Sequence, residues 1–168
     1  MKSTTLLLAM IVFLTTANEL QAEGGKSESR FLGTWRLVTT EATYRNGTKG
    51  PHPTLGPHGK AYLIYTPDHH MCAVLMNPGR PNWNSSSAAT EPEAKSAVDG
   101  FYAYCGTFEV HEEEHYVVHN LEVALTPNDV GEHWRRSFRF SGDRLILRPM
   151  ESNGDDIVDV TLTWERVH

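Results

Sequence analysis

Gly33-Thr34-Trp35 begins the first predicted β-strand, and Trp164-Glu165-Arg166 lies in the last predicted strand, near the other end of the chain. If these two segments meet, every strand between them belongs to one closed β-barrel. Closure is favourable because a closed barrel leaves no sheet edge free to pair with another chain. The hypothesis is therefore a barrel whose function depends on what its interior holds.

Runs of aromatic and β-branched residues, separated by turn-forming residues, predict about eight strands. These strands span residues 31–44, 61–66, 71–76, 101–110, 116–125, 134–140, 144–148 and 157–167. Most connections are short and contain Gly, Pro, Asn or Asp, which are typical of turns. Because short connections favour antiparallel neighbours, the predicted fold is all-β, a single closed antiparallel barrel.

One short helix is predicted near residues 91–99. Thr90 and Glu93 have the spacing of a capping box, Pro92 lies in the first turn, and Gly100 is suited to end the helix.

The first 22 residues have the features of an export signal: a basic start at Lys2, an apolar run over residues 6–14 and a small residue, Ala22, at the cleavage site. The alternative is an N-terminal core helix, but no polar residues repeat through this run to give it a wet face. We therefore expect a secreted or periplasmic protein. Its predicted parts are a signal peptide (1–22), a flexible leader (23–30) and a barrel domain (31–168).

Length and charge exclude several classes of protein. A chain of 168 residues is long enough for one domain with a sizeable core. Its net charge is −6, and removal of the signal takes away one base and one acid, so the charge is unchanged. A mildly acidic protein does not attract phosphate backbones, so nucleic acid is not an expected partner. The sequence contains no apolar run long enough to span a bilayer.

The chain has two cysteines, Cys72 and Cys105, both in predicted strands. In an exported protein a disulfide between them is chemically permitted. Alternatively, both are small buried thiols that fill positions in the β-strands. The sequence leaves both interpretations open, because it does not show whether the two Cβ atoms face each other.

Several segments, in order along residues 31–168, resemble the lipocalin-like domain family, within the wider lipocalin or calycin group. The segments that carry the resemblance are Leu32-Gly33-Thr34-Trp35-Arg36-Leu37-Val38, Tyr62-Leu63-Ile64-Tyr65-Thr66-Pro67-Asp68, Ala103-Tyr104, Gly106-Thr107, Pro127-Asn128, Gly131, Gly142-Asp143-Arg144-Leu145 and Trp164-Glu165-Arg166-Val167. As a set they are specific, whereas Gly-x-Trp alone is a weak signal.

The resemblance implies that Trp35 packs beneath Arg166 at the closed end of the barrel, next to Gly33. A guanidinium over an indole face gains cation–π energy of about 0.5–2 kcal/mol. This pair is structural and not catalytic. The resemblance also implies an internal cavity, and some fungal members of the family are associated with secondary-metabolite pathways.

His111-Glu112-Glu113-Glu114-His115 matches the His-Glu-x-x-His pattern of zinc proteases. That pattern binds zinc on a helix, where residues four apart share a face. Here both flanks are strand-like, so the segment predicts a charged hairpin tip rather than a catalytic or adventitious metal site. His52, His58 and His69-His70 are likewise expected in exposed loops, so no metal site is predicted.

Strict alternation along residues 134–140 places Trp134, Arg136 and Phe138 on the interior face. Pairing across the turn at residues 127–131 would bring Glu122 beside Arg136 and Asn120 beside Phe138. A buried Arg136 requires a counter-charge, because an isolated buried charge costs several kcal/mol. The predicted Glu122–Arg136 pair is either a satisfied internal ion pair or a polar anchor for a ligand.

Tyr65 and Tyr104 lie at positions that match the family, where they are either proton donors to a ligand or aromatic residues that fill the barrel. His119 falls on the outer face by strict alternation, but a β-bulge would turn it inward. The predicted ligand-binding residues are Tyr65, Tyr104, Asn120, Glu122, Trp134, Arg136 and Phe138. If the protein is an enzyme, the catalytic candidates are Glu122, Arg136, Tyr65, Tyr104 and His119.

Three functions are compatible with this sequence. The first is an exported barrel that binds a small hydrophobic molecule, with no cofactor. The second is a non-metal isomerase or cyclase of a secondary-metabolite pathway on the same barrel, which would act by holding a reactive conformer and offering proton donors. The third is a structural or interaction module with a filled interior.

Overall fold

The computed structural model describes residues 27–85, 87–151 and 156–168. The chain divides into two units at residues 32 and 33, and the strands all belong to the second unit. They are β1 (Gly33–Tyr44), β2 (Lys49–Gly50), β3 (Lys60–Tyr65), β4 (His70–Met76), β5 (Phe101–His111), β6 (Tyr116–Ala124), β7 (His133–Ser141), β8 (Arg144–Pro149) and β9 (Ile157–Arg166).

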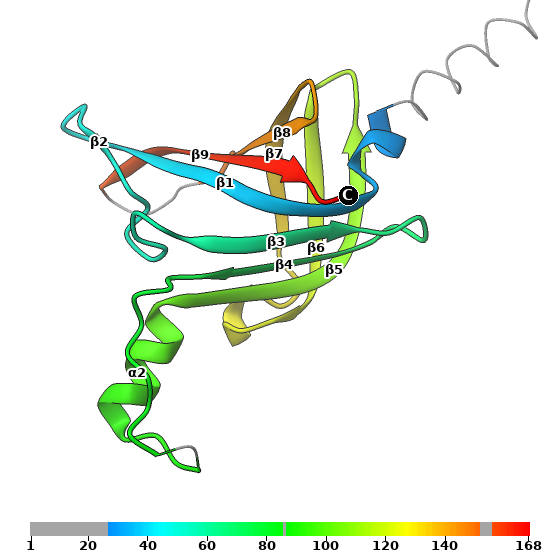
Figure 1. Ribbon diagram of the computed structural model, residues 1–168. Helices are drawn as coiled ribbons and strands as arrows, with labels where there is room; N and C mark the ends of the chain where they lie inside the picture. The colour runs from blue at the N-terminus through cyan, green and yellow to red at the C-terminus, as the bar shows by residue number, and fades with distance from the viewer. Residues whose placement is uncertain (1–26, 86, 152–155) are drawn as a thin grey trace, which may run out of the picture. The chain divides into compact units, whose positions relative to one another are not determined.

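The long strands close into an eight-stranded antiparallel barrel, which confirms the predicted fold class. Each strand from β3 to β8 pairs with the next along the chain, and β1 pairs with both β3 and β9. In Figure 1, β1 and β9 run side by side where the sheet closes. The two-residue β2 was not predicted, and it pairs with the far end of β1.

The ends of the chain that suggested closure do meet. Trp35 pairs directly with Arg166 across the β1–β9 seam, and the Arg166 guanidinium carbon lies 4.3 Å from the centre of the indole ring. Gly33 has a φ of +118°, and a Cβ at this position would lie 2.8 Å from Arg166 Nη1. The positive φ therefore favours glycine at position 33, and any Cβ there would also displace the end of the Arg166 side chain.

The predicted short helix is present as α2 (Glu91–Asp99), between β4 and β5. The Glu93 carboxylate accepts a hydrogen bond from the backbone N–H of Thr90, as the capping box requires, and a second one from the Thr90 hydroxyl. Residues 27–31 are also helical, where an irregular leader was expected, so the first strand begins at Gly33. The rest of that leader and the predicted signal peptide lie outside the described residues. Neither helix of the described chain is long and apolar enough to cross a membrane.

The core follows from the alternation of side chains along each strand. In β3, Ala61, Leu63 and Tyr65 are buried, while the residues between them are exposed. Trp35, Val117, Leu145, Val160 and Trp164 are buried from other strands. The interior of the barrel is therefore the hydrophobic core of the protein.

A β-bulge in β6 reverses the alternation at one point. Cys105 faces Val123 and Gly106 faces Leu121, so Glu122 has no direct partner in β5. The bulge depends on Gly106, because a Cβ there would lie 1.8 Å from the carbonyl oxygen of Asn120. On the N-terminal side of this bulge, Val117, His119 and Leu121 point inward.

Cys72 and Cys105 form a disulfide between β4 and β5. They are direct cross-strand partners, with Cα atoms 4.1 Å apart. The structure therefore selects the disulfide over two separate thiols. The His-Glu-x-x-His segment is the tip of the β5–β6 hairpin, as predicted: His111 pairs with Tyr116 across it.

Candidate functional site

A pocket of about 350 Å³ lies inside the barrel, and neither Trp35 nor Arg166 lines it. Its wall is formed by inward residues of β3, β4, β5, β6, β7, β8 and β9, together with the connection between β2 and β3. The lining residues are His52, Thr54, Leu55, Leu63, Ala73, Leu75, Tyr102, Tyr104, His119, Trp134, Arg136, Leu147, Pro149, Glu151, Val160, Leu162 and Trp164.

Most of this wall is apolar. Leu63, Ala73 and Leu75 cover one side from β3 and β4, and β8 and β9 contribute further aliphatic side chains. The aromatic rings of Tyr102 and Trp134 stack with centres 5.9 Å apart. An apolar wall with a few placed polar groups is the usual composition of a small-molecule site.

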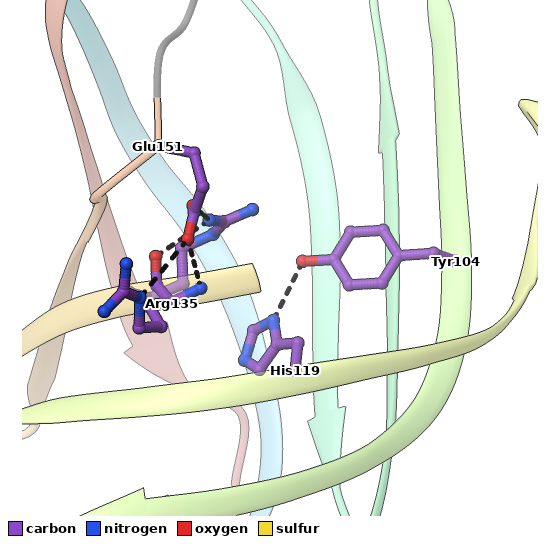
Figure 2. A network of polar contacts seen from close by, with 5 residues as sticks. Tyr104, His119, Arg135 and Glu151 are labelled. Atoms are coloured by element: carbon purple, nitrogen blue, oxygen red, sulfur yellow. Dashed lines mark hydrogen bonds and ion pairs between the residues drawn. The ribbon is translucent and has the colours of Figure 1, made fainter. Parts of the chain in front are cut away.

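His119 is the centre of the polar part of the pocket. It is 1% exposed, and its ring nitrogens contact two tyrosine hydroxyls. The Tyr65 hydroxyl lies 2.7 Å from Nε2, and the Tyr104 hydroxyl lies 3.0 Å from Nδ1. Figure 2 shows the Tyr104 hydroxyl directed at the His119 ring. One imidazole therefore links a phenol of β3 to a phenol of β5.

Burial keeps these three groups uncharged. Desolvation, together with the nearby Arg136 charge, lowers the pKa of His119 well below its ordinary value. Desolvation raises the pKa of Tyr65 well above its ordinary value. Burial also raises the pKa of Tyr104, although the Arg136 guanidinium opposes that rise. Near neutral pH the cluster therefore consists of a neutral imidazole and two neutral phenols.

Arg136 is the cation of the pocket, and Glu151 is its counter-ion. Nη1 of Arg136 lies 2.6 Å from Glu151 Oε2, and the Arg136 side chain is only 12% exposed. The guanidinium also lies over the Trp134 ring, 5.1 Å from its centre. Glu151 further accepts a hydrogen bond from the backbone N–H of Arg135, as Figure 2 shows. The ion pair is therefore held in place from two sides.

The rim of the pocket contains further polar groups. The Tyr102 hydroxyl donates a hydrogen bond to Asp129 Oδ2 over 2.8 Å. Burial, followed by this contact, raises the pKa of Tyr102. Burial lowers the pKa of His52, whose Nδ1 accepts a hydrogen bond from the backbone N–H of Thr54. His52 is therefore neutral near pH 7, with its proton on Nε2.

The structure brings together most of the predicted site residues. Tyr104, Trp134 and Arg136 line the pocket. His119, a candidate only through a bulge, also lines it, and Tyr65 adjoins it through the bond to His119. Phe138 instead packs against Phe140, whose ring lies 6.2 Å from Trp35, nearer the closed end.

The predicted Glu122–Arg136 pair is not formed. Glu122 is exposed, and Asn120 bonds Glu109 and His133 away from the pocket. The prediction centred the hairpin on residues 127–131. The actual pairing joins Val117 to Arg136, and β6 continues past the first residue of β7. The observed register differs from the predicted one by an odd number of residues. Glu122 and Asn120 therefore lie on the outer face of the barrel and not on the predicted interior face.

Glu151 is the partner that the sequence reasoning missed. Ser141 pairs with Arg144 across the tight turn at Gly142, and Arg136 pairs with Pro149. Counting outward from that turn places Glu151 opposite Trp134, on the interior face and near Arg136. The turn residues Ser141-Gly142-Asp143 therefore indicated the β7–β8 register from the sequence alone. Three more pocket residues were not predicted. His52 lies in the loop between β2 and β3, Tyr102 lies near the start of β5, and Trp164 lies in β9, at the seam with β1.

Comparison with known proteins identifies the family. The pattern of the lipocalin-like domain family matches residues 32–167. None of the curated proteins compared with the chain matches it.

Two solved structures are similar at low identity. A Schistosoma mansoni fatty acid binding protein in complex with arachidonic acid is 13% identical, with 84% of this chain and 99% of that chain covered and a TM-score of 0.41. A mutant of the fluorescent protein UnaG is 10% identical, with 82% and 96% covered and a TM-score of 0.40. These similarities are too low to carry an inference about function. The family match spans nearly the whole barrel, and the chain belongs to the lipocalin-like domain family.

Proposed function

We propose that this protein is a carrier that binds a small, largely apolar molecule inside its barrel. The observation that carries the proposal is the pocket of about 350 Å³, with an apolar wall and one cluster of polar groups. That volume lies at the lower end of the range for small-molecule sites, about 300–1,000 Å³. The ligand is therefore expected to be small.

The polar cluster supports binding in one orientation. His119, Tyr104 and the Arg136–Glu151 pair lie in a wall that is otherwise mostly aliphatic and aromatic. A ligand with a polar group at one end would place that group here and its apolar body against Leu63, Leu75 and the remaining wall. A few fixed polar groups in an apolar site commonly set the orientation of a ligand in this way.

Native mass spectrometry tests this proposal most simply. The protein is purified without detergent from the cells that make it, and its mass is compared before and after denaturation. We expect a bound species that is lost on denaturation and that extracts into organic solvent. A protein that carries no extractable molecule and binds none from a lipid extract of the same cells would contradict the proposal.

A non-metal enzyme on the same barrel is the second candidate, and the Tyr65–His119–Tyr104 contacts favour it. If Tyr104 gives its proton to the bound molecule, His119 can replace it with its own ring proton and take one from Tyr65 at its other nitrogen, and a proton returned by the bound molecule reverses these transfers and restores both phenols. Tyr104 reaches the pocket and would exchange that proton with the bound molecule. An isomerase or cyclase of a secondary-metabolite pathway would need such a group.

Hydrogen exchange into the ligand distinguishes the enzyme from the carrier. The extracted ligand is incubated with the protein in heavy water, and its deuterium content is followed by mass spectrometry. Enzymatic proton transfer predicts exchange with the wild-type protein and much slower exchange with Tyr104→Phe. Equal exchange with and without protein would leave the carrier as the only supported function.

A structural module is the third candidate, and it predicted a filled barrel. The pocket argues against it, because a solidly packed interior would leave no room of this volume.

We also propose that the protein is exported. The signal-like residues 1–22 support this, and so does the Cys72–Cys105 disulfide, because disulfides persist mainly in oxidising compartments. N-terminal sequencing of the protein from its native cells tests it. A mature protein that begins after residue 22 is expected, and one that retains Met1 would contradict export by cleavage.

A further inference from the structure

We infer that the pocket selects an uncharged ligand that carries a carbonyl-type oxygen, and that it rejects the corresponding carboxylate. This inference rests on the proposed function and specifies the chemical class of the ligand. It depends on three features of the pocket: the neutralised Arg136, the hydroxyl of Tyr104 and the indole N–H of Trp164.

The first feature is that Arg136, the one arginine or lysine among the described residues that line the pocket, already has a counter-charge. Arg136 would be the natural partner of a carboxylate, but its Nη1 already contacts Glu151 at 2.6 Å. Two further charged groups lie next to pocket residues: Asp129, which accepts the Tyr102 hydroxyl, and the exposed Arg135, whose Nε lies 4.0 Å from Glu151. An entering carboxylate would lose its hydration and meet the Glu151 carboxylate, which repels it.

The second feature is the direction of the hydrogen bonds around His119. A neutral imidazole has one N–H. The two contacts fit either tautomer, and the inference takes the one with that proton on Nδ1, in which the Tyr65 hydroxyl donates to Nε2 over 2.7 Å and Nδ1–H donates to the Tyr104 oxygen over 3.0 Å. The Tyr104 proton is then available to a group in the pocket, which Tyr104 lines. A ligand oxygen is the complementary acceptor.

The third feature is the indole of Trp164, which also lines the pocket. Trp164 is 2% exposed, and its Nε1–H has no acceptor within the described part of the chain. A buried donor without a partner is costly, and such groups in native proteins usually have a ligand or water as their partner. Less than 1 Å² of the Nε1 surface is accessible in this structure, so the inference has a bound ligand shift the side chains around Trp164 and place an oxygen, not a cation, on this donor.

Two matched ligands test the inference: methyl decanoate and decanoate, titrated near neutral pH by isothermal calorimetry. Both have the same acyl chain, and only decanoate is charged. We expect the ester to bind the wild-type protein at least about tenfold more tightly. Tighter binding of decanoate would overturn the inference while leaving the proposed carrier intact. If neither compound binds, the inference fails, whereas the proposed function fails only if the protein also carries no extractable molecule and binds none from a lipid extract of its cells.

Glu151→Gln provides the decisive variant. The substitution keeps an oxygen that accepts the Arg135 N–H but removes the charge that neutralises Arg136. The preference for the ester should then fall by about tenfold or reverse, because Arg136 becomes free to pair with decanoate. An unchanged preference in a folded Glu151→Gln protein would contradict the inference.

Glu165→Gln is the matched control. Glu165 pairs with Arg36 on the outer face of the barrel, where both side chains are exposed, and it does not line the pocket. The same loss of one charge there should leave the preference unchanged. If Glu165→Gln lowered it as much as Glu151→Gln does, net charge and not the Arg136 pair would set the preference.

Tyr104→Phe and Trp164→Phe test the two donors. Each substitution removes one donor and retains an aromatic ring. Each should lower the affinity for methyl decanoate by about three- to tenfold, as expected for the loss of a buried hydrogen bond. Circular dichroism and thermal unfolding establish that the variants are folded. Full ester affinity in both folded variants would contradict the assignment of these donors.

Discussion

The Arg166 guanidinium lies over the Trp35 indole, 4.3 Å from its centre, across the seam that joins the first and last long strands. The contact joins residues from the two ends of the barrel sequence, and neither of them lines the pocket. The pair therefore belongs to the seam that closes the barrel and not to the pocket.

Arg166→Met should therefore destabilise the protein without changing its ligand. The substitution keeps an aliphatic side chain over the indole and removes the cation–π contribution, about 0.5–2 kcal/mol. Urea unfolding measures the change in free energy. Arg36→Met is the control, because Arg36 is an exposed arginine one residue along β1, and it should cost less. Equal losses in the two variants would argue against a special role for the Trp35 contact.

Loss of the disulfide should lower stability more strongly. Cys72 and Cys105 are 33 residues apart in sequence, and closing a loop of this length stabilises a fold by roughly 3–4 kcal/mol in the chain-entropy model. The double variant Cys72→Ala/Cys105→Ala should show this loss in urea unfolding. The oxidised wild-type protein should also lose stability when a reductant is added, whereas the double variant should not respond.

The stability of the protein should fall when the pH drops below about 6.5, the ordinary pKa of histidine. In the native state burial lowers the pKa of His119, so the unfolded chain takes up a proton that the folded chain does not. The free energy of unfolding therefore decreases as the pH falls from 6.5 towards the lowered pKa, by about 1.4 kcal/mol per pH unit for one proton. His52, whose pKa burial also lowers, adds in the same direction.

Unfolding of His119→Gln between about pH 7.5 and pH 5.5 isolates this contribution. The variant should be less stable at the higher pH, because Tyr65 and Tyr104 lose their common partner. Its stability should also depend less steeply on pH than that of the wild type. His58→Gln, in an exposed loop, should retain the wild-type slope. The same slope in all three proteins would contradict a buried neutral His119.

The sequence contained most of the fold but only part of the site. Barrel closure, α2 and the β5–β6 hairpin were predictable because each depends on local patterns, namely alternation, a capping box and strand-like flanks. The position of Trp35 beneath Arg166 followed from the resemblance to the lipocalin-like domain family. Whether Cys72 and Cys105 are bonded was not predictable, because it depends on the register of β4 against β5.

The error at Glu122 shows why the site was harder to predict. Alternation assigns faces only while the register is known, and β6 pairs with β7 so that Val117, and not Glu122, lies opposite Arg136. The β6–β7 connection is also asymmetric, because β6 continues to Ala124 beyond its last paired residue, Asn120. The register therefore cannot be found by counting outward from the middle of the turn. By contrast, the tight turn at Gly142 is symmetric, and it would have placed Glu151 correctly.

The central claim is that the ligand binds inside the barrel. It is tested most directly by titrating ligand into a variant whose pocket is filled by a larger side chain. Ala73 lines the pocket and is 2% exposed, whereas the adjacent Val74 is 41% exposed on the outer face. Calorimetry with methyl decanoate or the extracted native ligand is compared for the wild type, Ala73→Phe and Val74→Phe. The account predicts binding to the wild type and Val74→Phe, and a loss of at least about a hundredfold in a folded Ala73→Phe, because the ring occupies the ligand volume. Equal binding to all three proteins would place the ligand outside the barrel and contradict the account.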